Sequence, residues 1–164
     1  MPGLHRSVAA VSVIMIILFW GCAAFPESSK GTYSTRVGTG TATDIKVYTP
    51  RILNKYHYDI ARFEESSDQL YFQTYWNNRS PFEDEEEMGI VDARTRFIIT
   101  TRSRSRSGMR PGVMNTVRLE VENQVRFRDE DEWKRVDVSD DLQSFVRNIV
   151  LELRSEIDTG VRSF

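Results

Sequence analysis

The feature that most constrains the fold is a strict alternation of side-chain types over residues 117–128. One set of alternate positions holds Val117, Leu119, Val121, Asn123, Val125 and Phe127, and every residue between them is Arg, Glu or Gln. Because successive side chains of a β-strand point to opposite faces, this pattern predicts a strand with one buried and one solvated face. Residues 91–102 alternate in the same way, from Val91 through Phe97 to Thr101. We therefore expect two long strands of an antiparallel sheet.

A long C-terminal helix is predicted over residues 139–160. Ser139 is followed by Asp140 and Asp141, which suits a helix N-terminus, and Gly160 is expected to end the helix. An apolar stripe runs along this segment at spacings of three and four residues: Leu142, Phe145, Val146, Ile149, Val150, Leu153 and Ile157. A stripe of this kind indicates a helix that packs on the sheet.

A second helix and two shorter strands complete the expected domain. Ile45, Tyr48, Ile52 and Tyr56 recur at helical spacing and predict a helix over residues 44–56, with Thr43 or Asp44 as the N-cap and Pro50 as either a kink or the first turn. Strands are predicted over 58–63 and 69–77, and loops over 78–89 and 103–112. The expected fold is α+β: a four-stranded antiparallel meander sheet with an N-terminal helix and a long C-terminal helix packed on one face.

The N-terminus has the pattern of an export signal. A short cationic start leads into the apolar run from Val8 to Trp20, which is followed by the small residues Gly21 to Ala24. Cys22 is the only cysteine, so an intramolecular disulfide is impossible and the core alone must hold the domain. We expect a signal peptide over 1–21, a flexible tether rich in Gly, Ser and Thr over 22–43, and a single α+β domain over 44–164.

The segment Leu18-Phe19-Trp20-Gly21-Cys22 resembles the lipobox of bacterial lipoproteins. In that family a small residue precedes a cysteine that is acylated and becomes the new N-terminus; Phe19 and Trp20 stand where an aliphatic and a small residue are usual. The resemblance implies a diacylglyceryl and acyl anchor on Cys22 and a location at the periplasmic face of the outer membrane. Two alternatives remain open.

In the first alternative, cleavage after Ala23 or Ala24 removes Cys22. In the second, the leader stays as an anchor, because Val8 to Phe25 approaches the roughly 18–20 apolar residues that span a bilayer. All three interpretations place Pro26 onward outside the cytoplasm.

The order of the elements, taken with Cys22, is similar to that of small lipoproteins that help to assemble the bacterial outer membrane. These are the β-barrel assembly lipoproteins with helix-grip domains and the lipopolysaccharide-transport lipoprotein with two helices on a four-stranded sheet. From Cys22, the tether and a domain without a catalytic constellation, we expect a non-catalytic interaction or assembly module with an envelope protein as its partner. No motif that would transfer a functional residue is shared.

Few residues point to catalysis or to metal binding. His57 is the only histidine after the leader and lies in no hydrolase motif. One histidine and one cysteine do not make a zinc or copper site.

The acidic run Glu83 to Glu87 lacks the ligand spacing of a calcium loop and is interpreted as a solvated loop. Asn78-Arg79-Ser80 matches a glycosylation sequon, which matters only in a eukaryotic secretory pathway. We expect no catalytic residue, no metal and no cofactor.

A group of arginines forms the candidate surface for an anionic partner. Its members are Arg94, Arg96, Arg102, Arg104, Arg106 and Arg110, expected together at one cationic end of the sheet. Guanidinium groups bind phosphate or carboxylate, so lipid headgroups or acidic glycans would suit an envelope location. The alternative is a solvated hairpin tip. Export, and the absence of aromatic residues from 103–112, argue against a nucleic-acid partner.

Two other functions are compatible with the sequence. The first is a carrier of a small apolar ligand, in which the helices and the sheet enclose a cavity lined by Trp76, Phe97 and Phe127. The second is an enzyme that uses paired carboxylates with shifted pKa values in a cleft. The overall charge does not distinguish between these functions. With 22 basic and 24 acidic residues, the chain favours no class of partner.

Overall fold

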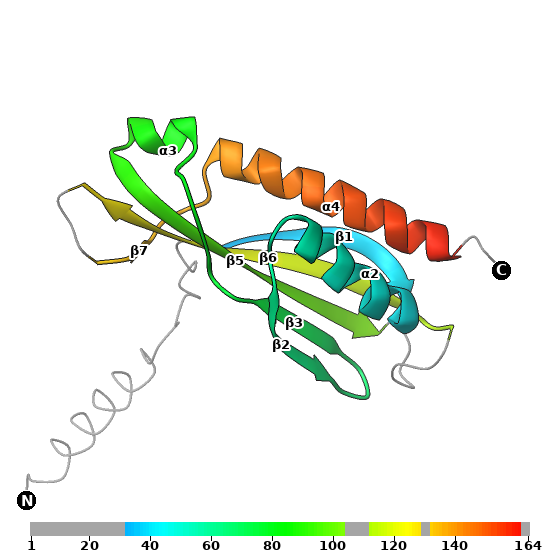
Figure 1. Ribbon diagram of the computed structural model, residues 1–164. Coiled ribbons are helices and arrows are strands. Elements are labelled where there is room, and N and C mark those ends of the chain that lie inside the picture. The colour runs from blue at the N-terminus through cyan, green and yellow to red at the C-terminus, as the bar shows by residue number, and fades with distance from the viewer. Residues whose placement is uncertain (1–31, 104–111, 129–131, 162–164) are drawn as a thin grey trace, which may run out of the picture.

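The computed structural model describes residues 32–103, 112–128 and 132–161, which form one antiparallel sheet and three helices (Figure 1). In chain order the elements are β1 (Thr32–Thr41), α2 (Ala42–Lys55), β2 (Ile60–Glu65), β3 (Leu70–Thr74), β4 (Asn77–Arg79), α3 (Glu83–Glu87), β5 (Ile90–Ser103), β6 (Met114–Phe127), β7 (Lys134–Arg135) and α4 (Asp140–Val161). The predicted α+β class and the C-terminal helix are confirmed. The prediction of four strands is wrong, because the sheet has seven.

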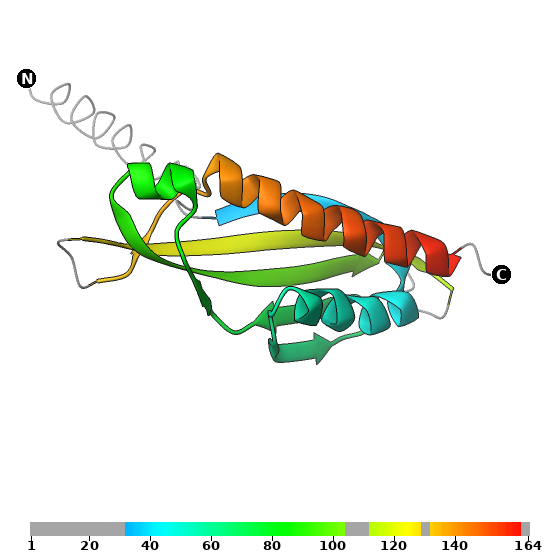
Figure 2. The ribbon, with the colours of Figure 1, turned by 45° about the horizontal axis from the view of Figure 1, so that its top comes forward.

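The sheet has the strand order β1-β6-β5-β3-β2, with the short strands β4 and β7 paired to β5 and β6. Its centre is the long antiparallel pair of β5 and β6, aligned so that Phe97 faces Val121. In Figure 2, α4 runs along the long strands and α2 lies beside it, near β3 and β2. We call the sheet face beneath these helices the inner face and the opposite one the outer face.

Strand β1 corrects the predicted tether, which was expected to continue to Thr43. Residues 32–41 pair with β6 from Thr32 opposite Glu122 to Thr41 opposite Met114. The glycines of this segment allow close packing: a Cβ on Gly40 would lie 3.3 Å from the Cβ of Ile157 in α4. The segment whose composition predicted a coil therefore forms an edge strand, and its small side chains allow the C-terminal helix to pack closely against it.

Helix α2 begins earlier than predicted. The hydroxyl of Thr41 accepts a hydrogen bond from the Asp44 backbone N–H at 3.2 Å, so Thr41 is the N-cap rather than Thr43 or Asp44. Pro50 lies inside the helix, not in its first turn. Two backbone hydrogen bonds close the C-terminus of the helix. His57 N–H donates to Asn54 O and Tyr58 N–H donates to Leu53 O, both at 2.9 Å. His57 has a φ of 63°, the left-handed conformation that glycine usually supplies at this position.

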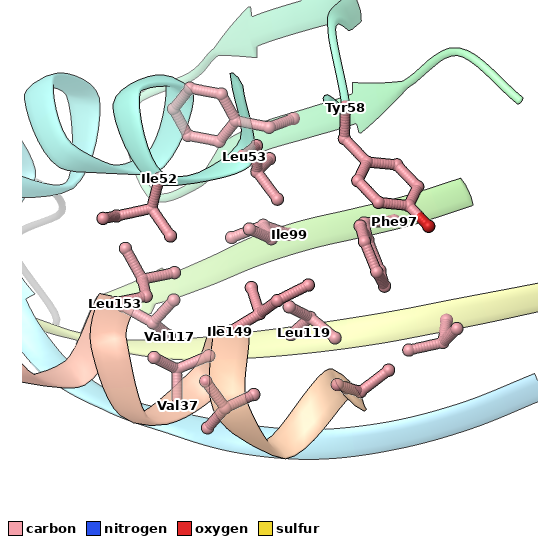
Figure 3. Packing of buried hydrophobic residues seen from close by; sticks show 14 of the residues in the cluster. Val37, Ile52, Leu53, Tyr58, Phe97, Ile99, Val117, Leu119, Ile149 and Leu153 are labelled. Atoms are coloured by element: carbon pink, nitrogen blue, oxygen red, sulfur yellow. The ribbon is translucent and has the colours of Figure 1, made fainter. Parts of the chain in front are cut away.

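The core lies between the inner face and the two long helices (Figure 3). Ile52 and Leu53 of α2 and Ile149 and Leu153 of α4 meet Ile99, Val117 and Leu119 of the sheet, and all are at most 2% exposed. Six of the seven residues of the predicted α4 stripe are buried, and Phe145 is partly buried. Ser139 caps the helix as predicted, by accepting from Leu142 N–H at 3.3 Å. The helix runs on to Val161, so Gly160 does not end it.

The predicted loop over residues 78–89 contains most of strand β4 and all of helix α3. A register shift between Ile90 and Asp92 then sets the phase of β5. As a result Ile90 is buried at 3% exposure, whereas Val91, predicted to face inward, is 39% exposed. From Ala93 to Thr101 the predicted inward positions are all buried.

Candidate functional site

The outer face of the sheet holds the candidate site, because α2 and α4 cover only the inner face. Alternation along β5 and β6 directs arginine, glutamate, glutamine and threonine side chains to this face. Its two ends differ: one carries tryptophans stacked with arginines, and the other carries arginines around a groove.

At the first end, Arg94 lies between two tryptophan rings. Its guanidinium carbon is 5.0 Å from the ring centroid of Trp76 and 4.3 Å from that of Trp133. The same guanidinium donates to the Gln124 side-chain oxygen at 2.9 and 2.6 Å. Burial, followed by the neighbouring Arg96 charge, lowers the pKa of Arg94. Arg94 is therefore held by ring faces and an amide, and no described carboxylate neutralises it.

The stack continues to neighbouring arginines that do have acidic partners. Arg96 lies 4.6 Å from the Trp76 ring and pairs with Glu122, and Arg126 lies 5.6 Å from the Trp133 ring and pairs with Asp92. Cation–π contacts of this kind are each worth about 0.5–1 kcal/mol at exposed sites. This end of the face is an amphipathic surface, of the composition that is enriched in protein interfaces.

At the other end lies a groove of about 610 Å³, which we call the outer groove. Its lining includes Thr100 and Arg102 of β5, Thr116 and Arg118 of β6, and Asp68 and Gln69 of the turn between β2 and β3. The turn is tied to β5 by a 3.3 Å bond from the Ser103 backbone N–H to the Asp68 backbone oxygen.

The structure does not gather the predicted arginines at one end of the sheet. Arg94, Arg96 and Arg102 share the outer face, but Arg94 and Arg102 are eight residues apart on one strand, a separation of about 27 Å. Arg104, Arg106 and Arg110 lie outside the described residues. Arg118, which the sequence analysis did not single out, takes the place beside Arg102; its outward position in the 117–128 alternation was the available signal.

The acidic run is not the solvated loop that the sequence predicted. Residues 83–87 form helix α3, and the Glu85 side chain is 1% exposed. Arg79 donates to both Glu85 carboxylate oxygens, at 2.6 and 2.7 Å, and to the Thr95 hydroxyl at 3.0 Å. Asn123 donates to Glu85 at 3.3 Å and accepts from Arg79 at 3.2 Å. These bonds fix α3 to the inner face, which is a structural role.

The aromatic residues proposed for a ligand cavity are not neighbours. Phe97 is fully buried against Tyr58, with ring centroids 4.3 Å apart. Phe127 packs against a separate small cluster with Ile90 and Val125, and Trp76 contacts the arginines of the outer face. An apolar groove of about 480 Å³ lies elsewhere, between α2 and the β2–β3 hairpin, lined by Pro50, Ile60, Phe63 and Phe72 among others.

His57 stands at the end of α2, where its backbone oxygen accepts from the Asn77 side chain at 3.1 Å. Over the described ranges, no group of three or more His, Cys, Asp or Glu side chains is arranged to hold a metal ion. Within the same ranges, no helix is both long enough and apolar enough to cross a membrane. Cys22 lies outside these ranges. No protein-family model and no curated protein matches this chain.

Proposed function

We propose that this chain is a non-catalytic, lipid-anchored envelope protein whose α+β domain acts as an interaction or assembly module at the periplasmic face of a bacterial outer membrane. The observation that carries the proposal is the position of Cys22, directly after an apolar leader and close to the start of β1. Residues 23–31 separate Cys22 from β1, and a fully extended chain of this length spans about 30–35 Å. The anchor would therefore keep the domain near the membrane.

The outer face supports the interaction role. It presents Arg94 of β5 with Trp76 and Trp133, which lie next to strands β4 and β7, and tryptophan and arginine are the residues that most often dominate binding energy in protein interfaces. The helix face, in contrast, has its apolar residues packed into the core.

Metabolic labelling with an alkyne-bearing palmitate tests the anchor. We expect label on the full-length protein expressed in a diderm bacterium and none on Cys22→Ser. Ser7→Ala, in the leader, is the matched control and should retain the label. Absence of label from the unaltered chain, or equal label on Cys22→Ser, would remove the anchor from the proposal.

Site-specific photocross-linking tests the interaction role separately. A benzophenone side chain at Gln73, which faces outward on β3, should yield adducts with an envelope protein. The same group at Arg147, exposed on α4, is the matched control and should yield fewer. Adducts that form mainly at position 147 would contradict the assignment of the outer face.

A second candidate function is the carriage of a small apolar ligand, and the groove between α2 and β2 favours it. Its volume of about 480 Å³ falls within the roughly 300–1,000 Å³ typical of ligand sites, and Phe63 at its rim is 46% exposed. Binding of an apolar fluorophore that is lost in Phe63→Asp and kept in Val47→Asp, an exposed α2 control, would support this function. Equal binding by all three proteins would oppose it.

A further inference from the structure

The outer groove brings together two arginines and two threonines in a fixed register. Thr100 lies opposite Arg118, and Arg102 lies opposite Thr116, on the two central strands. All four side chains point outward, so the two arginine positions occupy one diagonal of a four-residue patch and the two threonine positions occupy the other. Diagonal positions on neighbouring strands are about 7–8 Å apart. One small anion between them is therefore within reach of donors from both strands.

The two arginines of the outer groove have no carboxylate partner among the described residues, in contrast to four other arginines of the sheet and its connections. Arg62, Arg79, Arg96 and Arg126 each pair with a carboxylate. No such ion pair within the described ranges involves Arg102 or Arg118, and Arg118 donates instead to the Ser34 hydroxyl at 3.2 Å. The Asp68 carboxylate in the wall accepts from the Ser66 hydroxyl at 2.9 Å.

A third arginine increases the local charge. Arg36 of β1 lies directly opposite Arg118, and like charges at such positions destabilise a sheet. Segment 104–111, which follows β5, contains no acidic residue in the sequence. A bound anion would offset this repulsion.

We propose that the outer groove binds a phosphate-type, tetrahedral oxyanion through Arg102, Arg118, Thr100 and Thr116. Guanidinium groups bind phosphate as two-pronged donors, and hydroxyls can donate to the remaining oxygens. A carboxylate has only two oxygens, in one plane, and one guanidinium satisfies both; a group with three or four oxygens can use donors from all four corners. The phosphate can belong to a lipid headgroup or to a soluble phosphate, and the groove recognises the shared chemistry. This inference does not depend on lipidation of Cys22.

Protection of arginines from phenylglyoxal, quantified by peptide mass spectrometry, tests the proposal on the full-length chain. The protein is added to phosphatidylcholine vesicles, with or without inorganic phosphate. We expect phosphate to slow modification of Arg102 and Arg118 severalfold, and to leave Arg51 and Arg147, exposed on the helix side, unaffected. Sodium acetate at equal ionic strength should protect much less.

A second arm distinguishes the two sources of phosphate. Vesicles that contain phosphatidylglycerol should protect Arg102 and Arg118 without added phosphate if the ligand is a headgroup, whereas protection only by inorganic phosphate indicates a soluble ligand. Either result supports the site. Modification rates of Arg102 and Arg118 that neither inorganic phosphate nor phosphatidylglycerol changes would overturn it.

A double threonine variant tests the role of the hydroxyls without altering the charge of the groove. Thr100→Val with Thr116→Val preserves side-chain shape and removes both hydroxyls, and should raise the phosphate concentration for half-protection at least about fivefold, because hydrogen bonds to charged groups are strong. Thr32→Val, at the far end of β1, is the matched control and should not change that concentration. An unchanged half-protection concentration in the double variant would exclude the four-residue site.

Discussion

At the end of α2, an unfavourable backbone conformation at one residue is followed by a buried side chain at the next. His57 adopts a left-handed backbone, and Tyr58 directly after it is 2% exposed. The hydrogen bond from Tyr58 N–H to Leu53 O turns the chain at the end of α2, so that the tyrosine ring enters the core. The strain at His57 is thus offset by packing at Tyr58.

Glycine at position 57 should stabilise the protein. His57→Gly removes the Cβ that disfavours a φ of 63°, and after the greater flexibility of the unfolded glycine chain is subtracted, we expect a gain of about 0.5–1 kcal/mol. Urea unfolding followed by circular dichroism measures it. His57→Ala retains the Cβ and should show no gain. A loss of stability in His57→Gly would contradict the role of backbone strain.

Tyr58 should make stability decline at alkaline pH. Burial raises the pKa of this phenol to about 12, against opposing effects of Arg79 and a hydrogen bond with Thr95. Because the folded pKa is raised, this contribution is fully present below the unfolded pKa of about 10 and is lost as pH rises through about 12.

Comparison with Tyr58→Phe isolates this effect. Between pH 9 and pH 12 the unaltered protein should lose about 2–3 kcal/mol more of its free energy of unfolding than Tyr58→Phe loses. Denaturant melts at the two pH values measure the difference. Parallel losses in the two proteins would show that Tyr58 does not titrate with unfolding.

At the scale of elements, the short pieces depend on side chains that reach them from other parts of the chain. Helix α3 has only five residues and is held by the Arg79–Glu85 pair. Asp84, also in α3, accepts from the Asp141 backbone N–H of α4 at 3.1 Å. Helix α3 therefore links the sheet to the start of the C-terminal helix.

Removal of Arg79, the partner of the buried Glu85 carboxylate, should lower stability strongly. Arg79→Met leaves the Glu85 carboxylate buried without its charge partner, and we expect a loss of about 3–5 kcal/mol. Arg79→Met combined with Glu85→Gln removes the stranded charge and should recover part of the loss. The exposed Lys46–Glu65 pair is the control, and Lys46→Met should cost at most about 1 kcal/mol. Similar costs for Arg79→Met and Lys46→Met would refute the structural role.

The elements with a clear hydrophobic period could be predicted from the sequence, whereas β1, β4, β7 and α3 could not. Residues 117–127 and 142–157 have uninterrupted periods, so β6 and α4 were recognisable from local pattern alone. Strand β1 was missed because its glycines resemble those of a linker, and their close approach to Ile157 involves residues far apart in the sequence. Trp76, predicted to line an inner cavity, contacts outer-face arginines instead, and strand β3 ends before it at Thr74.

The candidate site was predictable only in part, for the same reason. Alternation placed Arg94, Arg96 and Arg102 on one face, but whether an arginine is paired depends on the neighbouring strand. Glu122 and Asp92 lie beside two outer-face arginines, and Thr116 lies beside Arg102. The register between β5 and β6 decides which residue lies beside each arginine, and local sequence pattern does not reveal that register.

We expect the domain to require strand β1 for folding, because β1 pairs with β6 along its length and contacts α4. A chain that begins at Asp44, the predicted domain start, lacks the partner of β6 and the surface beneath α4, and should show no cooperative thermal transition. A chain that begins at Thr32 keeps every described element and should unfold cooperatively. Equal melting temperatures in circular dichroism would restore the interpretation of residues 32–43 as a tether.

At the scale of the whole molecule, the fold and the proposed anchor together limit how far the outer face can lie from the membrane. One sheet face is occupied by the core, and the other presents the tryptophan stack and the outer groove. Attachment at Cys22 would leave only residues 23–31 between the membrane and β1, an edge strand of that sheet. The outer face would then be available close to the membrane surface, where headgroups and envelope proteins are concentrated.

The intact mass of the mature protein, purified in detergent from the membranes of a diderm bacterium, tests the central claim most directly. We expect a chain that begins at Cys22 and carries the added mass of a diacylglyceryl group and an acyl chain. An unmodified chain that begins at Ala24 or Phe25, or an uncleaved chain of 19.0 kDa, would contradict the lipid anchor.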